Sequence, residues 1–111
     1  MLNIVKVYSN DQMTDMGLNY YWQCSFRYRF SNLSKIELER ATKKILSDMG
    51  CGHNLTFGVK VNPTSVRVWY DHSNPTAERI ARQATDKLLA AVKNQWKENG
   101  QFKDYVGTLV V

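Results

Sequence analysis

The run from Tyr20 to Phe30 constrains the fold of this chain more than any other segment. Aromatic or apolar side chains alternate there with mostly polar or basic ones. A repeat of two residues places alternate side chains on opposite faces of a β-strand. The run therefore predicts one long strand. Its buried face would carry Tyr20, Trp22, Cys24, Phe26, Tyr28 and Phe30, and its other face Tyr21, Gln23, Ser25, Arg27 and Arg29.

A well-marked helix start follows this strand. Ser34 and Glu37 have the spacing of a capping box, in which each side chain binds the other residue's free backbone N–H. Gly50 is suited to the left-handed turn that ends a helix. The sequence therefore predicts a helix over residues 35–49. Its apolar stripe would be Leu38, Ala41, Ile45 and Met49.

The second half of the chain repeats this order of elements. Alternating residues flank the segment Asn62-Pro63-Thr64, which predicts a second β-hairpin with a tight turn. Asn74 is a good helix cap, and Pro75 suits the first helical position, so we expect a helix from there to Gly100.

The remaining segments complete the predicted sheet. Residues 2–8 form a short β-rich run, which we expect to pair with the long strand as a first hairpin. The tail from Tyr105 to Val111 is also β-prone and could add an edge strand.

Together these elements predict an α+β fold with the order ββαββα(β). We expect a two-layer sandwich in which a four- or five-stranded, mainly antiparallel sheet is covered by two helices on one face. The chain of 111 residues is long enough for one hydrophobic core, so we predict a single domain over residues 1–111. The other face of the sheet would be open.

Composition narrows the class of protein further. The chain has a net charge of +5, which attracts polyanions in general. It has no apolar run near the roughly 20 residues of a membrane span and no signal-peptide pattern, so we expect a cytoplasmic protein with no membrane partner. We expect Cys24 and Cys51 to be reduced thiols in that compartment.

The open face carries the candidate binding site. Arginines that contact phosphate, next to an aromatic ring on which a base can stack, are typical of surfaces that bind single-stranded nucleic acid. Two plainer interpretations remain: the cations are ordinary solvated residues, or Trp69 anchors a face-to-face homodimer. The predicted nucleic-acid or anion site consists of Arg27, Arg29, Lys60, Arg67 and Trp69.

Catalytic and metal sites are weakly indicated. Cys51 and His53 could form a nucleophile and its base, and with Cys24 and His72 they could bind zinc. Their spacing matches no standard zinc pattern, and Cys24 is predicted to face the core. We therefore expect no catalytic residues, no metal and no cofactor, with Cys51 as a small apolar filler after the first helix.

The leading hypothesis is a non-enzymatic binding module whose anionic partner is nucleic acid. The alternative is a small protein-binding inhibitor or adaptor of the phage or mobile-element type, which could be a homodimer. An enzyme that uses Cys51 and His53 is the third hypothesis.

Overall fold

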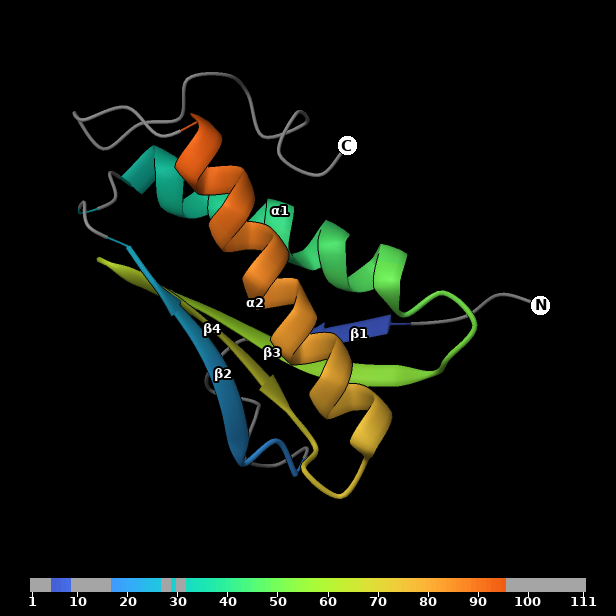
Figure 1. Cartoon of the computed structure of the whole chain (residues 1–111). Coiled ribbons are helices and arrows are strands. Elements are labelled where there is room, and N and C mark those ends of the chain that lie inside the picture. Colours follow the sequence, from blue (N-terminus) through green and yellow to red (C-terminus); the bar gives the residue numbers. More distant parts are fainter. Residues whose placement is uncertain (1–4, 9–16, 27–28, 30–31, 96–111) are drawn as a thin grey trace.

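A computed structural model describes residues 5–8, 17–26, 29 and 32–95 of the chain (Figure 1). Strands and helices follow one another in the predicted order, two strands and then a helix in each half, and the α+β class is confirmed. The elements are β1 (Val5–Tyr8), β2 (Tyr20–Ser25), α1 (Asn32–Met49), β3 (Leu55–Asn62), β4 (Ser65–Tyr70) and α2 (Pro75–Gln95).

The sheet is organised around the predicted second hairpin. β3 and β4 pair antiparallel across the tight turn between Asn62 and Ser65, and β2 pairs antiparallel with β4 on its other side. β1 lies parallel to β3, which gives the strand order β1-β3-β4-β2.

The predicted first hairpin is therefore wrong, because β1 and β2 lie at opposite edges of the described sheet. Pairing β3 with β4 leaves one free edge on each of these strands. β1 occupies the edge of β3 and β2 occupies that of β4. In the sequence, β1 and β2 are also separated by far more than the two residues of a tight hairpin turn. The edge strand predicted in the tail lies outside the described residues.

Strand β2 is shorter than predicted, because it ends at Ser25 rather than at Phe30. Ser25 lies opposite Ser65, the first residue of β4. The next backbone hydrogen bond, from the N–H of Phe26 to the carbonyl of Thr64 at 2.8 Å, already reaches into the hairpin turn. Phe26 and Arg29, the described residues of the predicted extension, lie outside the strand, because β4 begins at Ser65. The rest of that extension lies outside the described residues.

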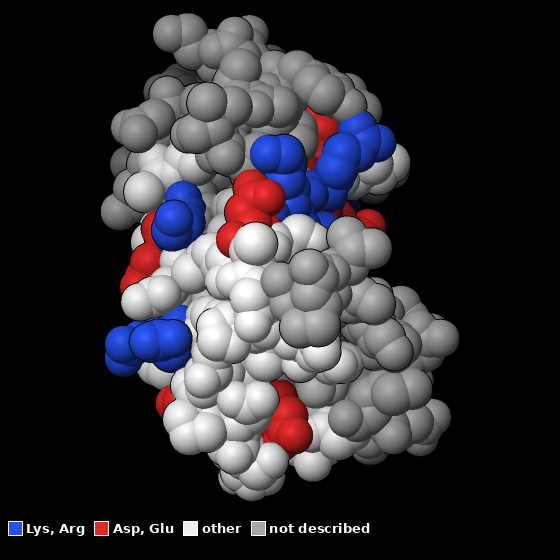
Figure 2. All heavy atoms as spheres, turned by 90° about the vertical axis from the view of Figure 1, so that its right-hand side faces the viewer, with Lys and Arg blue, Asp and Glu red and all other residues white. Residues whose placement is uncertain are grey.

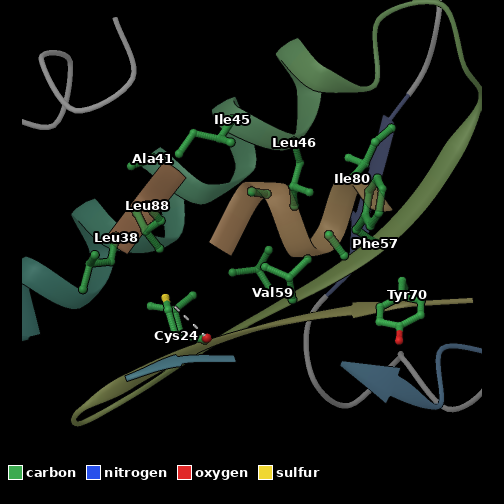
Figure 3. Packing of buried hydrophobic residues seen from close by; sticks show 14 of the residues in the cluster. Cys24, Leu38, Ala41, Ile45, Leu46, Phe57, Val59, Tyr70, Ile80 and Leu88 are labelled. Atoms are coloured by element: carbon green, nitrogen blue, oxygen red, sulfur yellow. Dashed lines mark hydrogen bonds between the residues drawn. The ribbon is translucent and has the colours of Figure 1, made fainter. Parts of the chain in front are cut away.

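Both helices cover one face of the sheet (Figure 1). Side chains of α1 and α2 meet those of β2, β3 and β4 in a continuous hydrophobic core (Figure 3). Phe57, Val66 and Val68 point from the sheet into this core and are completely buried. The predicted buried face of β2 is only partly correct. Cys24 is buried and Trp22 is half-buried, but Tyr20 is 52% exposed at the start of this edge strand.

The helix α2 begins as predicted. The Asn74 side-chain oxygen accepts hydrogen bonds from the backbone N–H groups of Thr76, at 3.1 Å, and Ala77, at 3.2 Å. The apolar stripe of α2 is buried at Ala77, Ile80, Ala81, Ala84, Leu88 and Val92. Its predicted end near Gly100 lies outside the described residues.

The end of α1 differs slightly from the prediction. Gly50 does not have a positive φ, because its N–H still donates to the carbonyl of Leu46 at 2.8 Å and so continues the helical pattern. The left-handed residue is Gly52, with a φ of 99°. The side chain of Ser34, and with it the predicted capping box, lies outside the described side chains. Neither α1 nor α2, the two helices described, is long and apolar enough to cross a membrane.

A basic and aromatic surface on the outer face of the sheet

The outer face of the sheet, which we define as the face opposite to α1 and α2, is set by the strand register. Alternate residues of β2, β3 and β4 enter the core, so the intervening residues point to the outer face. Two adjacent rows cross that face. The first contains Tyr21, Trp69 and Gly58, and the second contains Gln23, Arg67 and Lys60.

Arg67, near the middle of this surface, is held by two neighbours. Its Nε donates a hydrogen bond to the Oε1 of Gln23 at 2.7 Å. Its guanidinium carbon lies 4.5 Å from the centre of the Tyr21 ring, which is a cation–π contact. Gln23 is oriented in turn, because its Nε2 donates to the hydroxyl of Ser25 at 3.1 Å. The direction of the guanidinium is therefore fixed by β2.

Two aromatic rings extend this surface beside the arginine. The rings of Tyr21 and Trp69 are 4.6 Å apart and tilted by 53°. Tyr21 is 41% exposed, whereas Trp69 is half-buried and its indole N–H is enclosed without a hydrogen-bond partner among the described residues. We refer to Tyr21, Gln23, Lys60, Arg67 and Trp69 as the basic–aromatic cluster.

The structure brings some of the predicted site residues together and leaves others apart. Lys60, Arg67 and Trp69 share the outer face as predicted, although all three are half-buried. Arg29 is exposed but follows the end of β2, and Arg27 lies outside the described residues. Sequence reasoning missed Tyr21 as the accessible ring. The sequence did contain a signal for an exposed Tyr21 ring, because Tyr21 occupies a position on the polar face of the alternating run.

The electrostatic character of the sheet differs from that of the helices. The four described strands contain Lys6, Lys60 and Arg67 but no aspartate or glutamate. On α1, by contrast, Lys43 lies 3.2 Å from Glu39 and Lys44 lies 3.5 Å from Asp48. Figure 2 shows a side of the molecule where lysine and arginine side chains likewise lie next to carboxylates. Lys60 and Arg67 form no ion pair with any side chain that the structure describes.

The cysteines and histidines show no comparable arrangement. Cys24 is buried, its thiol lies 3.8 Å from the carbonyl of Val66, and burial raises its pKa to about 12. Such a thiol is neither a nucleophile nor a ready metal ligand at neutral pH. Cys51 and His53 are both exposed, so the prediction that Cys51 fills a gap is wrong: the chain has already left the core there. Among residues 5–8, 17–26, 29 and 32–95, no three His, Cys, Asp or Glu side chains could hold a metal ion.

The one carboxylate that directly follows a strand is engaged locally. Asp71, just after β4, accepts hydrogen bonds from the hydroxyl of Ser73 at 2.7 Å and from its N–H at 3.0 Å. These two bonds hold the pKa of Asp71 below its usual value. Asp71 therefore stabilises the turn into α2.

Comparison with known proteins gave no match. No family model, curated protein or solved structure matches this chain. Its function has to be inferred from the chemistry of the outer face.

Proposed function

We propose that this protein is a non-enzymatic binding module that engages single-stranded nucleic acid through the basic–aromatic cluster. One observation carries the proposal: the Arg67 guanidinium is held against the exposed ring of Tyr21, and Lys60 is the neighbour of Arg67 in the register. Surfaces that bind single strands combine aromatic rings with cations, because the unpaired bases stack on the rings and the negative phosphates contact the cations.

The aromatic part of the cluster suits an unpaired base. Tyr21 offers an accessible ring, and its contact with Trp69 at 4.6 Å limits its movement. A base stacked on such a ring contributes roughly 1–3 kcal/mol. Bases in a duplex already stack on one another, so this contribution favours single strands.

The cationic part suits the phosphates. Gln23 and Tyr21 orient Arg67 without neutralising it, because an amide oxygen and a ring carry no net charge. The terminal amino groups of Arg67 form no hydrogen bond to any described residue, so they remain available to phosphate oxygens. Lys60 on the neighbouring strand adds a second charge, and the overall charge of +5 strengthens long-range attraction.

The first test replaces both cations, Lys60→Ala with Arg67→Ala. Its matched control is Lys43→Ala with Lys44→Ala, which removes the same charge from exposed positions on α1. Binding is measured by fluorescence anisotropy with a labelled strand of about 20 nucleotides, longer than the roughly 4–16 nucleotides that one small domain covers. Circular dichroism verifies that each variant is folded.

We expect the Lys60/Arg67 variant to bind at least about tenfold more weakly than the control. For two lost phosphate contacts, the slope of log affinity against log salt should fall by about 1.4 for a single strand. Equal affinities of the two double variants, or no binding by the wild type at low salt, would falsify the proposal. Association with a protein that persists in high salt would favour the adaptor hypothesis instead.

A second test addresses the ring. Tyr21→Leu keeps an apolar side chain but removes the flat aromatic surface, and Tyr21→Phe retains it. We expect Tyr21→Leu to weaken single-strand binding by roughly 5- to 150-fold, corresponding to the loss of one stacked base. Tyr21→Phe should bind within about twofold of the wild type. Equal loss in both variants would show that stacking is not involved.

A further inference from the structure

Strand β2 has no partner among the described residues on the edge away from β4, and the register shows which of its backbone groups point toward that edge. Within the described chain β2 pairs only with β4. The N–H of Phe26 donates to Thr64, so even-numbered residues of β2 direct their backbone groups toward β4. The odd-numbered residues Tyr21, Gln23 and Ser25 therefore direct their N–H and C=O groups away from the sheet.

This edge lacks the features that usually prevent strands from pairing with one another. Natural edge strands carry charges, prolines or bulges, or are very short. β2 has six residues, Tyr-Tyr-Trp-Gln-Cys-Ser, with no charge and no proline. The strand at the opposite edge, β1, is shorter and carries Lys6. Two of the three exposed large hydrophobic residues in the described chain, Tyr20 and Tyr21, also lie on β2.

We propose that β2 pairs antiparallel with β2 of a second copy of this chain. Residues facing one another across the new ladder must share a face of the sheet, which restricts the register. A two-fold axis through Gln23 satisfies this condition and pairs Tyr21 with Ser25 of the other copy. It also uses all three outward-pointing residues of each strand. Because β2 is uncharged, self-pairing brings no like charges together on the strand.

This arrangement joins the two sheets into one, with all helices on the same face. Tyr21 and Gln23 lie on β2, the strand next to the proposed two-fold axis. The basic–aromatic clusters of the two copies therefore become neighbours on one continuous outer face. This differs from the face-to-face homodimer considered from the sequence, which would hide Trp69. The inference does not depend on nucleic-acid binding, and its test contains no nucleic acid.

Mass in solution is the primary test. A six-residue strand pair buries less than the roughly 1,200–2,000 Å² of a stable interface, so we expect an equilibrium that favours dimers only at high concentration. Sedimentation equilibrium should show the wild-type mass rising toward twice that of one chain as concentration approaches the order of 1 mM. Gln23→Lys, which places two charges at the axis, should remain at one chain's mass. Gln83→Lys, at an exposed position on α2, should behave as the wild type.

Cross-linking supplies a second readout that does not depend on disrupting β2. Opposed residues of a hydrogen-bonded antiparallel pair have Cα atoms about 5.5 Å apart, within the range of a disulfide. In a Cys51→Ser background, Gln23→Cys should form a covalent dimer under mild oxidation and Gln83→Cys should form much less. A wild type with one chain's mass throughout, or equal cross-linking at both positions, would overturn the inference.

Discussion

At the scale of single residues, burial determines the chemistry of Cys24. Its side chain is 4% exposed and packs between the sheet and the helices (Figure 3). Removal from water disfavours the thiolate, and this is the largest cause of its raised pKa. Tyr70 is also buried, and burial together with the charge of Glu78 raises its pKa. Both groups therefore favour a folded state in which they keep their protons.

We predict that the protein loses stability as the pH rises above about 9. Below that pH the thiol of Cys24 is protonated in both the folded and the unfolded state, so its ionisation does not lower the free energy of unfolding. Between pH 9 and 12 the unfolded chain releases the proton and the folded chain retains it, which stabilises the unfolded state. Because the pKa of this thiol is 9 in the unfolded chain and about 12 in the folded chain, its ionisation lowers the free energy of unfolding by at most about 4 kcal/mol. Tyr70 acts in the same direction at higher pH.

Urea unfolding of the wild type and of Cys24→Ala at pH 8 and at pH 10.5 checks this prediction. Cys24→Ala is less stable at pH 8 because it leaves a small cavity. However, it should lose less stability than the wild type between the two pH values. Equal losses in the two proteins would contradict the assignment to Cys24.

At the scale of elements, local capping determines where α2 begins. Asn74 satisfies two backbone N–H groups of the first turn, and Pro75 occupies a position that needs no N–H donor. Asp71 and Ser73 order the preceding turn through two hydrogen bonds. The path from β4 into α2 is thus encoded in residues 71–77.

We predict that Asn74→Ala lowers the free energy of unfolding by about 1 kcal/mol, because it leaves two N–H groups of α2 without their protein acceptor. Asn74→Asp is the matched control, since its carboxylate can accept the same bonds and interacts well with the helix N-terminus. Urea unfolding at pH 7 measures the free energy of unfolding of both variants. A control as unstable as Asn74→Ala would show that the cap is not the cause.

At the scale of the whole molecule, one sheet separates two different surfaces. The inner face is covered by α1 and α2 and holds the core, and the outer face carries the basic–aromatic cluster. Phe57 and Lys60 show this separation within β3, because three positions apart in a strand means opposite faces. Stability and the proposed binding therefore depend on different residues of the same strand.

We predict that Phe57→Ala destabilises the fold by roughly 3–5 kcal/mol, because Phe57 is completely buried and its removal leaves a large cavity. Lys60→Ala should change stability by no more than about 0.5 kcal/mol, since it removes no core contact. Thermal and urea unfolding of both variants provide the comparison. Similar destabilisation by the two substitutions would mean that the outer face is also part of a packed core.

Much of the fold could be predicted because its signals are local. The hairpin around Pro63, the start of α2 at Asn74 and the buried stripe of α2 each follow from a few neighbouring residues. The alternation in β2 likewise predicted that Gln23 and Cys24 lie on opposite faces. Backbone geometry and side-chain periodicity act over short distances, so the sequence is sufficient for these features.

Strand pairing and the accessible part of the site were decided by the tertiary structure. β1 pairs with β3 rather than β2, and no local pattern records this, because the pairing joins segments that are distant in the chain. The same geometry ends β2 at Ser25, and the surface beside it leaves Tyr21 more accessible than Trp69. The sequence thus determined the elements and their faces. Contacts between residues distant in the chain determined which strands meet and which side chains remain in contact with water.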